Sequence, residues 1–241
     1  MNKSTQNSNE DLVHNVLSVL EQKLSLLLAG SHFTEVVVPD KYKLLKGQHT
    51  FEAFELWTRR FTHPKLQHVT FASLQENGKR RAITVYALPL SNQSLPIFGM
   101  DYVGFGGFLT LAALDLAPTD PEFWNHYAKP VLEACHQGKQ NCIERKLPEN
   151  MQKVFSNQAL VLAAKDLAAC ENAIDFAIET MKHYCQWLDE QTEIALSIKH
   201  SESLEKWCLA MQQNKKESGA LSRLFGEAAE SYLISYLFLP S

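Results

Sequence analysis

Residues 67–88 read QHVTFASLQENGKRRAITVYAL, and this stretch decides the fold class. Apolar residues alternate with small or polar ones on both sides of its centre, at Val69 and Phe71 and again at Ile83 and Val85. Such alternation is typical of strands that bury one face. The central Glu76-Asn77-Gly78-Lys79 favours a tight turn, because Asn and Gly tolerate the positive φ that hairpin turns need. The stretch therefore predicts an antiparallel hairpin.

Segments of similar texture extend this hairpin into a larger sheet. We expect strands over about 51–57, 98–103 and 109–116, and a further strand at the apolar run 159–164. A glycine-rich bend over 104–108 joins two of them. Because successive strands are linked by short turns, an antiparallel meander is the economical topology.

Helical patterns flank the strands on both sides in the sequence. An apolar stripe repeats every four residues from Leu12 to Leu28 and predicts a helix over 11–29, closed by Gly30. After Pro118 we expect helices over about 120–132, 170–196, 203–213 and 221–238. The fold class is therefore α/β, a three-layer α/β/α sandwich with a central antiparallel sheet. Residues 11–241 form one domain, and the polar residues 1–10 are expected to be a disordered tail.

The amino-acid composition argues against some classes of function. The 241 residues include 23 Lys and Arg against 27 Asp and Glu, which gives a formal net charge of −4. This mild acidity argues against a nucleic-acid partner, since phosphate contacts need clustered basic residues. We see no apolar run near the roughly 20 residues that span a bilayer, so no membrane association is expected. We expect a monomer.

The cysteine pattern bears on cofactors and compartment. There are five cysteines, an odd number without a CxxC pair, which indicates structural thiols in a reducing cytoplasm and no metal site. The bend 104–109 lacks the third glycine of GxGxxG and opens no helix, and Walker A, HExxH and GxSxG sequences are absent. No bound cofactor is therefore expected, and electrons for any redox chemistry would come from outside.

Asp101 is the strongest candidate for a catalytic residue. It lies in Phe98-Gly99-Met100-Asp101-Tyr102-Val103, a strand otherwise made of apolar and small residues. A carboxyl group buried there would have a raised pKa and could donate protons near neutral pH. An edge-strand carboxylate facing solvent is the alternative, and composition alone favours it. His68 has the same two interpretations, as a member of a proton network or as a surface histidine.

At these residues the sequence resembles the ferredoxin-dependent bilin reductases. Leu95-Pro96-Ile97-Phe98-Gly99-Met100-Asp101 is similar to the family's strand that ends in its central catalytic aspartate. Three later segments also resemble family motifs, in the same order along the chain: Ala113–Thr119, Arg145-Lys146-Leu147-Pro148, and Leu224–Ala228 with Tyr232 and Leu237-Phe238. The resemblance covers roughly Thr50 to the end.

The resemblance implies an enzyme that reduces biliverdin or a related bilin with single electrons from reduced ferredoxin, without a flavin or metal of its own. Asp101 would be the proton donor, with His68 as a neighbour. Arg145, Lys216 and Thr110 are the candidates for binding the propionates, because guanidinium and ammonium groups pair with carboxylates. Ferredoxins are acidic, so docking is expected at a basic patch, either Arg59-Arg60 or Lys79-Arg80-Arg81.

Three departures from the family pattern bear on the product. Thr84 stands where some members carry a histidine or asparagine facing the aspartate, and Thr70 where the glutamate linked to D-ring vinyl reduction is expected. Asn214-Lys215 stands where several members carry a second aspartate. A threonine cannot supply a proton at neutral pH. We therefore expect two-electron reduction at the C–D bridge, which gives 15,16-dihydrobiliverdin. The alternatives are phycoerythrobilin or phycocyanobilin as product, a bilin carrier without chemistry, and an unrelated sandwich domain.

Overall fold

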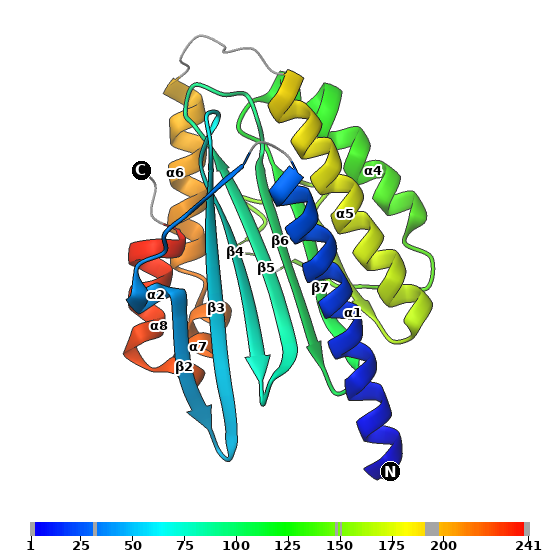
Figure 1. The fold of residues 1–241 in the computed structure, drawn as a ribbon. Coiled ribbons are helices and arrows are strands. Elements are labelled where there is room, and N and C mark those ends of the chain that lie inside the picture. The colour runs from blue at the N-terminus through cyan, green and yellow to red at the C-terminus, as the bar shows by residue number, and fades with distance from the viewer. Residues whose placement is uncertain (1–2, 31–32, 148, 150, 191–197, 239–241) are drawn as a thin grey trace.

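In the computed structural model, one antiparallel sheet is covered by helices on both faces (Figure 1). The structure describes residues 3–30, 33–147, 149, 151–190 and 198–238. The three-layer α/β/α arrangement predicted from the sequence is confirmed.

Nine strands of the described ranges make up the sheet. They are β1 (Thr34–Val36), β2 (Leu44–His49), β3 (Glu52–His63), β4 (Leu66–Glu76), β5 (Lys79–Pro89), β6 (Ile97–Phe105), β7 (Phe108–Ala117), β8 (Ile143–Glu144) and β9 (Leu160–Ala164). Their order is β1-β3-β4-β5-β6-β7-β9-β8, and β2 also pairs with β3. From β3 to β7 each strand pairs with the next, so the predicted meander is confirmed.

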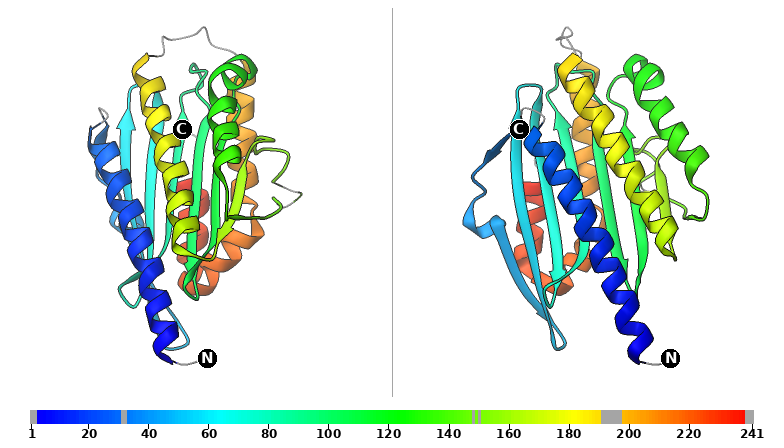
Figure 2. Two further views of the ribbon diagram at one scale, coloured as in Figure 1. Left: turned by 90° about the vertical axis from the view of Figure 1, so that its right-hand side faces the viewer. Right: turned by 45° about the vertical axis from the view of Figure 1, so that its right-hand side comes forward.

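The helices divide between the two faces. Those of the described ranges are α1 (Lys3–Gly30), α2 (Asp40–Lys43), α3 (Pro121–Phe123), the π-helix η1 (Trp124–Ala128), α4 (Lys129–Gly138), α5 (Leu167–Glu190), α6 (Ile198–Gln212), α7 (Lys215–Phe225), α8 (Glu227–Tyr232) and the π-helix η2 (Leu233–Leu237). Helices α1, α4 and α5 lie on one face, and α6, α7 and α8 lie on the other (Figures 1 and 2). Each face has its own hydrophobic cluster.

The first cluster joins α1 and α5 to the sheet. The apolar stripe of α1 is buried: Val13, Val16, Leu17, Leu20, Leu24 and Leu28. It packs with the inward residues of the central hairpin, Val69, Phe71, Ile83 and Val85, which are also buried. The alternation noted in the sequence therefore marks the face that α1 and α5 cover.

Helix α1 differs from expectation at its start. The chain is helical from Lys3, eight residues before the predicted start at residue 11, and disorder of residues 1–10 stays a prediction. The helix starts early because residues 3–10 include no Pro or Gly, and each added residue extends an established helix by one hydrogen bond.

A second correction concerns membrane spans. Residues Leu12–Gly30 of α1 are long and apolar enough to cross a membrane, contrary to the expectation that no run approaches that length. A buried helix of a protein core passes the same test, and the apolar stripe of α1 packs on the sheet. The absence of membrane association stays a prediction.

The helices after the sheet are more broken than their apolar periodicity suggests. The segment predicted as a helix over 120–132 begins as α3, continues as η1 and ends as α4. The helix predicted over 221–238 is interrupted at Gly226, whose φ of 61° is outside the helical region. Residues 191–196 of the predicted helix 170–196 lie outside the described residues.

Close packing of β2 on α7 gives a first prediction. A Cβ at Gly47 would overlap the Leu224 carbonyl oxygen, so Gly47→Ala should lower the free energy of unfolding by about 1–3 kcal/mol. Gly219 lies within α7, and a Cβ there meets no atom within 4 Å, so Gly219→Ala should instead stabilise by up to about 1 kcal/mol. Urea unfolding of both variants tests the pair. Equal effects of the two substitutions on the free energy of unfolding would contradict the close approach of Gly47 to Leu224.

Candidate functional site

Asp101 lies on the sheet face that α6–α8 cover. On this strand its neighbour two residues away is Gly99, and a Cβ at Gly99 would approach the Trp207 side chain of α6. Alternate residues of a strand share a face, so Asp101 points the same way. Directly opposite Asp101 in the register are Thr84 on β5 and Ala113 on β7. The Thr84 hydroxyl donates a hydrogen bond of 2.7 Å to Oδ1 of Asp101.

The surroundings of Asp101 favour its protonated form. Burial raises the pKa of the carboxyl group, and the hydrogen bond from Thr84 lowers it by less. A carboxyl group in such surroundings keeps its proton to a higher pH than a solvated one and can release it to a base held against it. Asp101 is half-buried on a central strand, so it is not the solvent-facing carboxylate of an edge strand, and its role as proton donor stays a prediction.

The row of residues across the sheet at Asp101 holds no other titratable side chain. It runs Ala72, Thr84, Asp101 and Ala113. Thr70 lies two residues further along β4, in the row of Tyr86 and Gly99. The prediction that Thr84 faces the aspartate agrees with this register, whereas Thr70, the position predicted for the vinyl-linked glutamate, lies outside the row, and Ala72 was not predicted because strand register cannot be read from composition.

His68 is buried but lies away from Asp101. It is 5% exposed, and its pKa is lowered to about 3, chiefly by burial and secondly by the charge of Arg60. It is four residues along β4 from Ala72, which is about 13 Å, and β4 lies about 10 Å across the sheet from β6. The expectation that His68 neighbours Asp101 is therefore wrong. Because its ring is neutral at pH 7, it has no proton to spare as an acid.

The proposed propionate-binding residues lie on or beside different elements of the fold. Arg145 is exposed directly after β8, where its backbone N–H donates to Val161 at 2.7 Å. Thr110 lies at a register shift of β7, and its hydroxyl donates to the Val103 carbonyl at 3.2 Å. Asn214 is half-buried just before α7, and Lys216 lies in the first turn of that helix. No contact joins Arg145 to Thr110.

A buried aspartate on β7, Asp115, positions the segment that follows Arg145. Oδ2 of Asp115 accepts from the Ser156 backbone N–H at 2.8 Å, and Oδ1 accepts from the Ser156 hydroxyl at 2.5 Å. Burial raises its pKa to about 6. The chain before Ser156 packs into the second hydrophobic cluster through Leu147, Met151, Val154 and Phe155. Sequence reasoning missed Asp115, although it too is a carboxylate in an apolar strand.

The basic groups suggested for ferredoxin docking are largely paired within the chain. Arg59 makes a two-pronged ion pair with Glu35, at 2.7 and 2.9 Å. Arg80 pairs with Glu21, and Arg81 pairs with Glu76. Partly buried Arg60 points at the C-terminal π-helix. These arginines therefore offer less free positive charge than the sequence suggests, and the docking face stays a prediction.

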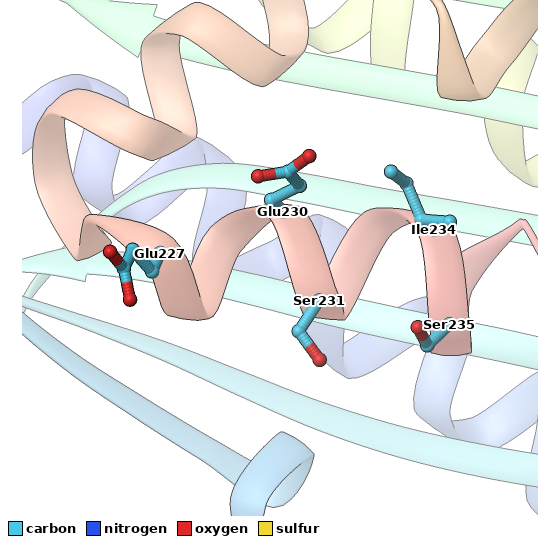
Figure 3. A pocket seen from close by; sticks show the side chains of 5 residues that line it. All are labelled: Glu227, Glu230, Ser231, Ile234 and Ser235. Atoms are coloured by element: carbon cyan, nitrogen blue, oxygen red, sulfur yellow. The ribbon is translucent and has the colours of Figure 1, made fainter.

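A shallow cavity of about 330 Å³ lies elsewhere, on the exposed face of α8 and η2 (Figure 3). It is lined by Glu227, Glu230, Ser231, Ile234 and Ser235. None of these is a predicted site residue, and the helix separates them from the sheet face that carries Asp101. In the described part of the chain, no group of three or more His, Cys, Asp or Glu side chains is placed to hold a metal ion.

Comparisons with known proteins show which family the chain belongs to. The family model for ferredoxin-dependent bilin reductases matches residues 22–239, so the chain belongs to this family. A curated relative, phycocyanobilin:ferredoxin oxidoreductase of Trichodesmium erythraeum, is 27% identical over 160 residues. That stretch covers 62% of this chain and 62% of the relative, less than two thirds of its length.

Two solved structures share the fold. One is phytochromobilin synthase from tomato in complex with biliverdin, with a TM-score of 0.74 and 14% identity over 92% of this chain and 82% of that one. The other is a protein called PcyX, with a TM-score of 0.52 and 10% identity over 92% of this chain and 97% of that one. The family expected from the four sequence motifs is confirmed.

The hydrogen bond between Thr84 and Asp101 gives a second prediction. Thr84→Val removes a donor that favours the carboxylate, so the pKa of Asp101 should rise further. In infrared spectra, the carboxylic-acid stretch of Asp101, assigned by its loss in Asp101→Asn, should persist to higher pH. Thr62→Val, at an exposed site on β3, is the control and should leave the titration unchanged. A lowered or unmoved pKa in Thr84→Val would refute the assigned role.

Proposed function

We propose that the chain is an enzyme that reduces an open-chain tetrapyrrole with electrons from reduced ferredoxin. The observation that carries this proposal is Asp101, a carboxyl group with a raised pKa on the sheet face below the C-terminal helices. The family match supports the reaction class, and two relatives are named for bilin chemistry or carry biliverdin. We infer biliverdin as substrate, a monomeric enzyme and a cytoplasmic location.

The bilin would lie between the sheet and α6–α8, with Asp101 beneath it. Two electrons from ferredoxin and two protons saturate one double bond. Asp101 supplies a proton to the ring system as the electron arrives and is reprotonated from solvent afterwards. Arg145, Lys216 and Thr110 would hold the propionates, and Asp115 would position the segment after Arg145 through Ser156.

The role of Asp101 gives a third prediction. Asp101→Asn removes the proton donor but keeps the size of the side chain and its bond to Thr84. We expect retained biliverdin binding and turnover reduced by about 10²–10⁴-fold, the range for a lost general acid. Stopped-flow absorbance under anaerobic conditions measures both. Asp175→Asn, at an exposed site of α5, is the matched control and should be fully active. Undiminished turnover by the Asp101→Asn variant would show that Asp101 is not the proton donor.

The row Ala72–Thr84–Asp101–Ala113 supports the expected product and gives a fourth prediction. The row holds a single proton donor. Reduction at the C–D bridge is the reaction that needs the fewest protein donors, because one carboxyl group beside that bridge can deliver the proton. The product should be 15,16-dihydrobiliverdin, whose long-wavelength absorption lies strongly to the blue of biliverdin because the conjugation is interrupted. A product with an unsaturated C–D bridge, such as phycocyanobilin, would show this prediction to be wrong.

The second candidate function is a bilin carrier without catalytic activity. The scarcity of proton donors around Asp101 favours it over functions unrelated to bilins. Thr70 and Thr84 stand where the resemblance implies a glutamate and a histidine or asparagine, and neither threonine can donate a proton at neutral pH, so the site holds fewer donors than the resemblance implies. Anaerobic incubation with biliverdin, ferredoxin and a reducing system separates the two. A carrier gives a stable bound spectrum, whereas the enzyme gives a new product.

A further inference from the structure

Three side chains on the Asp101 face of the sheet form a polar cluster under η2. They are Arg60 on β3, His68 on β4 and Tyr236 on η2, here called the Arg60 cluster. The Arg60 guanidinium lies 3.6 Å from the centroid of the Tyr236 ring. Its Nη2 donates to the Tyr236 carbonyl at 2.6 Å, and its Nε donates to the Thr70 hydroxyl at 3.3 Å. The cluster therefore joins the last helical segment to the sheet.

The guanidinium has more donors than its contacts use. An arginine side chain carries five N–H groups, and two of its nitrogens are engaged. Burial lowers the pKa of Arg60, and only Tyr236 and Tyr232 act in the opposite direction. No acidic side chain of the described residues pairs with it. A partly buried cation without a carboxylate is costly unless something polar completes its shell.

Two further atoms of the cluster lack partners. Nε2 of His68 and the hydroxyl of Tyr236 are buried without a hydrogen bond, and the two residues are 5% and 6% exposed. Buried polar atoms are nearly always paired in native structures, so two together beside an incomplete guanidinium indicate a missing ligand. All of them belong to the face on which the bilin is proposed to lie.

Whether each of these atoms donates or accepts a hydrogen bond restricts the chemical groups that the ligand can have. The bond between His68 and the Leu237 backbone raises the pKa of His68, so the ring donates in it. A neutral imidazole has one N–H, and since Nε2 is the unpartnered nitrogen, it offers a lone pair. The site therefore accepts one hydrogen bond, at His68, and donates others, from Arg60 and Tyr236. A ligand needs an N–H and an oxygen close together.

We propose that the Arg60 cluster binds the lactam edge of a terminal pyrrolinone ring of the bilin, an inference that rests on the proposed function. The lactam N–H would donate to Nε2 of His68, and the lactam oxygen would accept from Arg60 and the Tyr236 hydroxyl. A propionate fits less well, because a carboxylate has no hydrogen for Nε2. The placement also suits a ligand of four rings, since His68 lies two strands from Asp101, about 10 Å across the sheet and about 13 Å along it.

Tyr236→Phe tests the proposal with little risk to the fold. The change removes only the hydroxyl and keeps the ring that stacks on Arg60. Because that hydroxyl has no partner, its loss should leave the unfolding midpoint unchanged or raise it. Affinity for biliverdin should fall about three- to tenfold. Tyr127→Phe, at a 54% exposed tyrosine stacked on Phe123, is the matched control and should bind biliverdin as the wild type does.

Modified ligands identify which group of the bilin is bound. His68→Leu should weaken biliverdin binding to a similar degree. Both losses should persist with biliverdin dimethyl ester, which lacks the propionate charges, and should disappear with the bis-lactim ether, which lacks the lactam N–H. If the losses disappear with the dimethyl ester instead, the cluster binds a propionate and the proposal is wrong.

The remaining outcomes separate this proposal from the proposed function. Unchanged affinity in both variants, with wild-type protein that binds and reduces biliverdin, overturns the lactam site alone. Wild-type protein that binds no bilin overturns the lactam site and the proposed function together.

Discussion

The pairing register of β4, β5 and β6 decides which side chains share each face of the sheet. In that register Thr84 lies opposite Asp101, while Ile83, Val85 and Met100 turn to the face covered by α1 and α5. A shift of one residue would exchange the two sets and place a carboxyl group in the first hydrophobic cluster. The cost of burying that charge beside α1, together with the exposure of the apolar set, holds the register in place.

Burial by the C-terminal helices acts on Asp101 and His68, two titratable groups of this face, in opposite directions. It raises the pKa of Asp101, because the charged form of a carboxyl group loses hydration, and it lowers the pKa of His68 for the same reason. Burial by the same helices therefore favours the protonated form of Asp101 and the neutral form of His68. The division of roles follows from this: Asp101 is suited to proton donation, and His68 is suited to accept a hydrogen bond from a ligand.

Local patterns were sufficient to predict the sheet and the aspartate, and insufficient for the rest of the site. The central hairpin and Asp101 could be predicted because alternation and a lone carboxylate in an apolar strand are visible within ten residues. Ala72 could not, because it meets Thr84 only through the register across a turn. The Arg60 cluster could not either, since Arg60 and Tyr236 are far apart in the sequence and their contact depends on how η2 packs. The start of α1 at Lys3 was not predicted, because a polar sequence without an apolar stripe carries no local sign of a helix.

The second hydrophobic cluster connects these polar groups. Trp207 of α6 and Phe238 after η2 meet Tyr86 of β5, with ring centroids 5.5 and 5.1 Å from the Tyr86 ring. Tyr86 lies two residues from Thr84 and opposite Thr70, so this aromatic group stands between Asp101 and the Arg60 cluster. Such surfaces exclude water and favour a flat, conjugated ligand, while the polar groups at either side would fix its orientation. Since Trp207 and Phe238 come from the last forty residues, the fold of that segment is a condition for the chemistry proposed for Asp101.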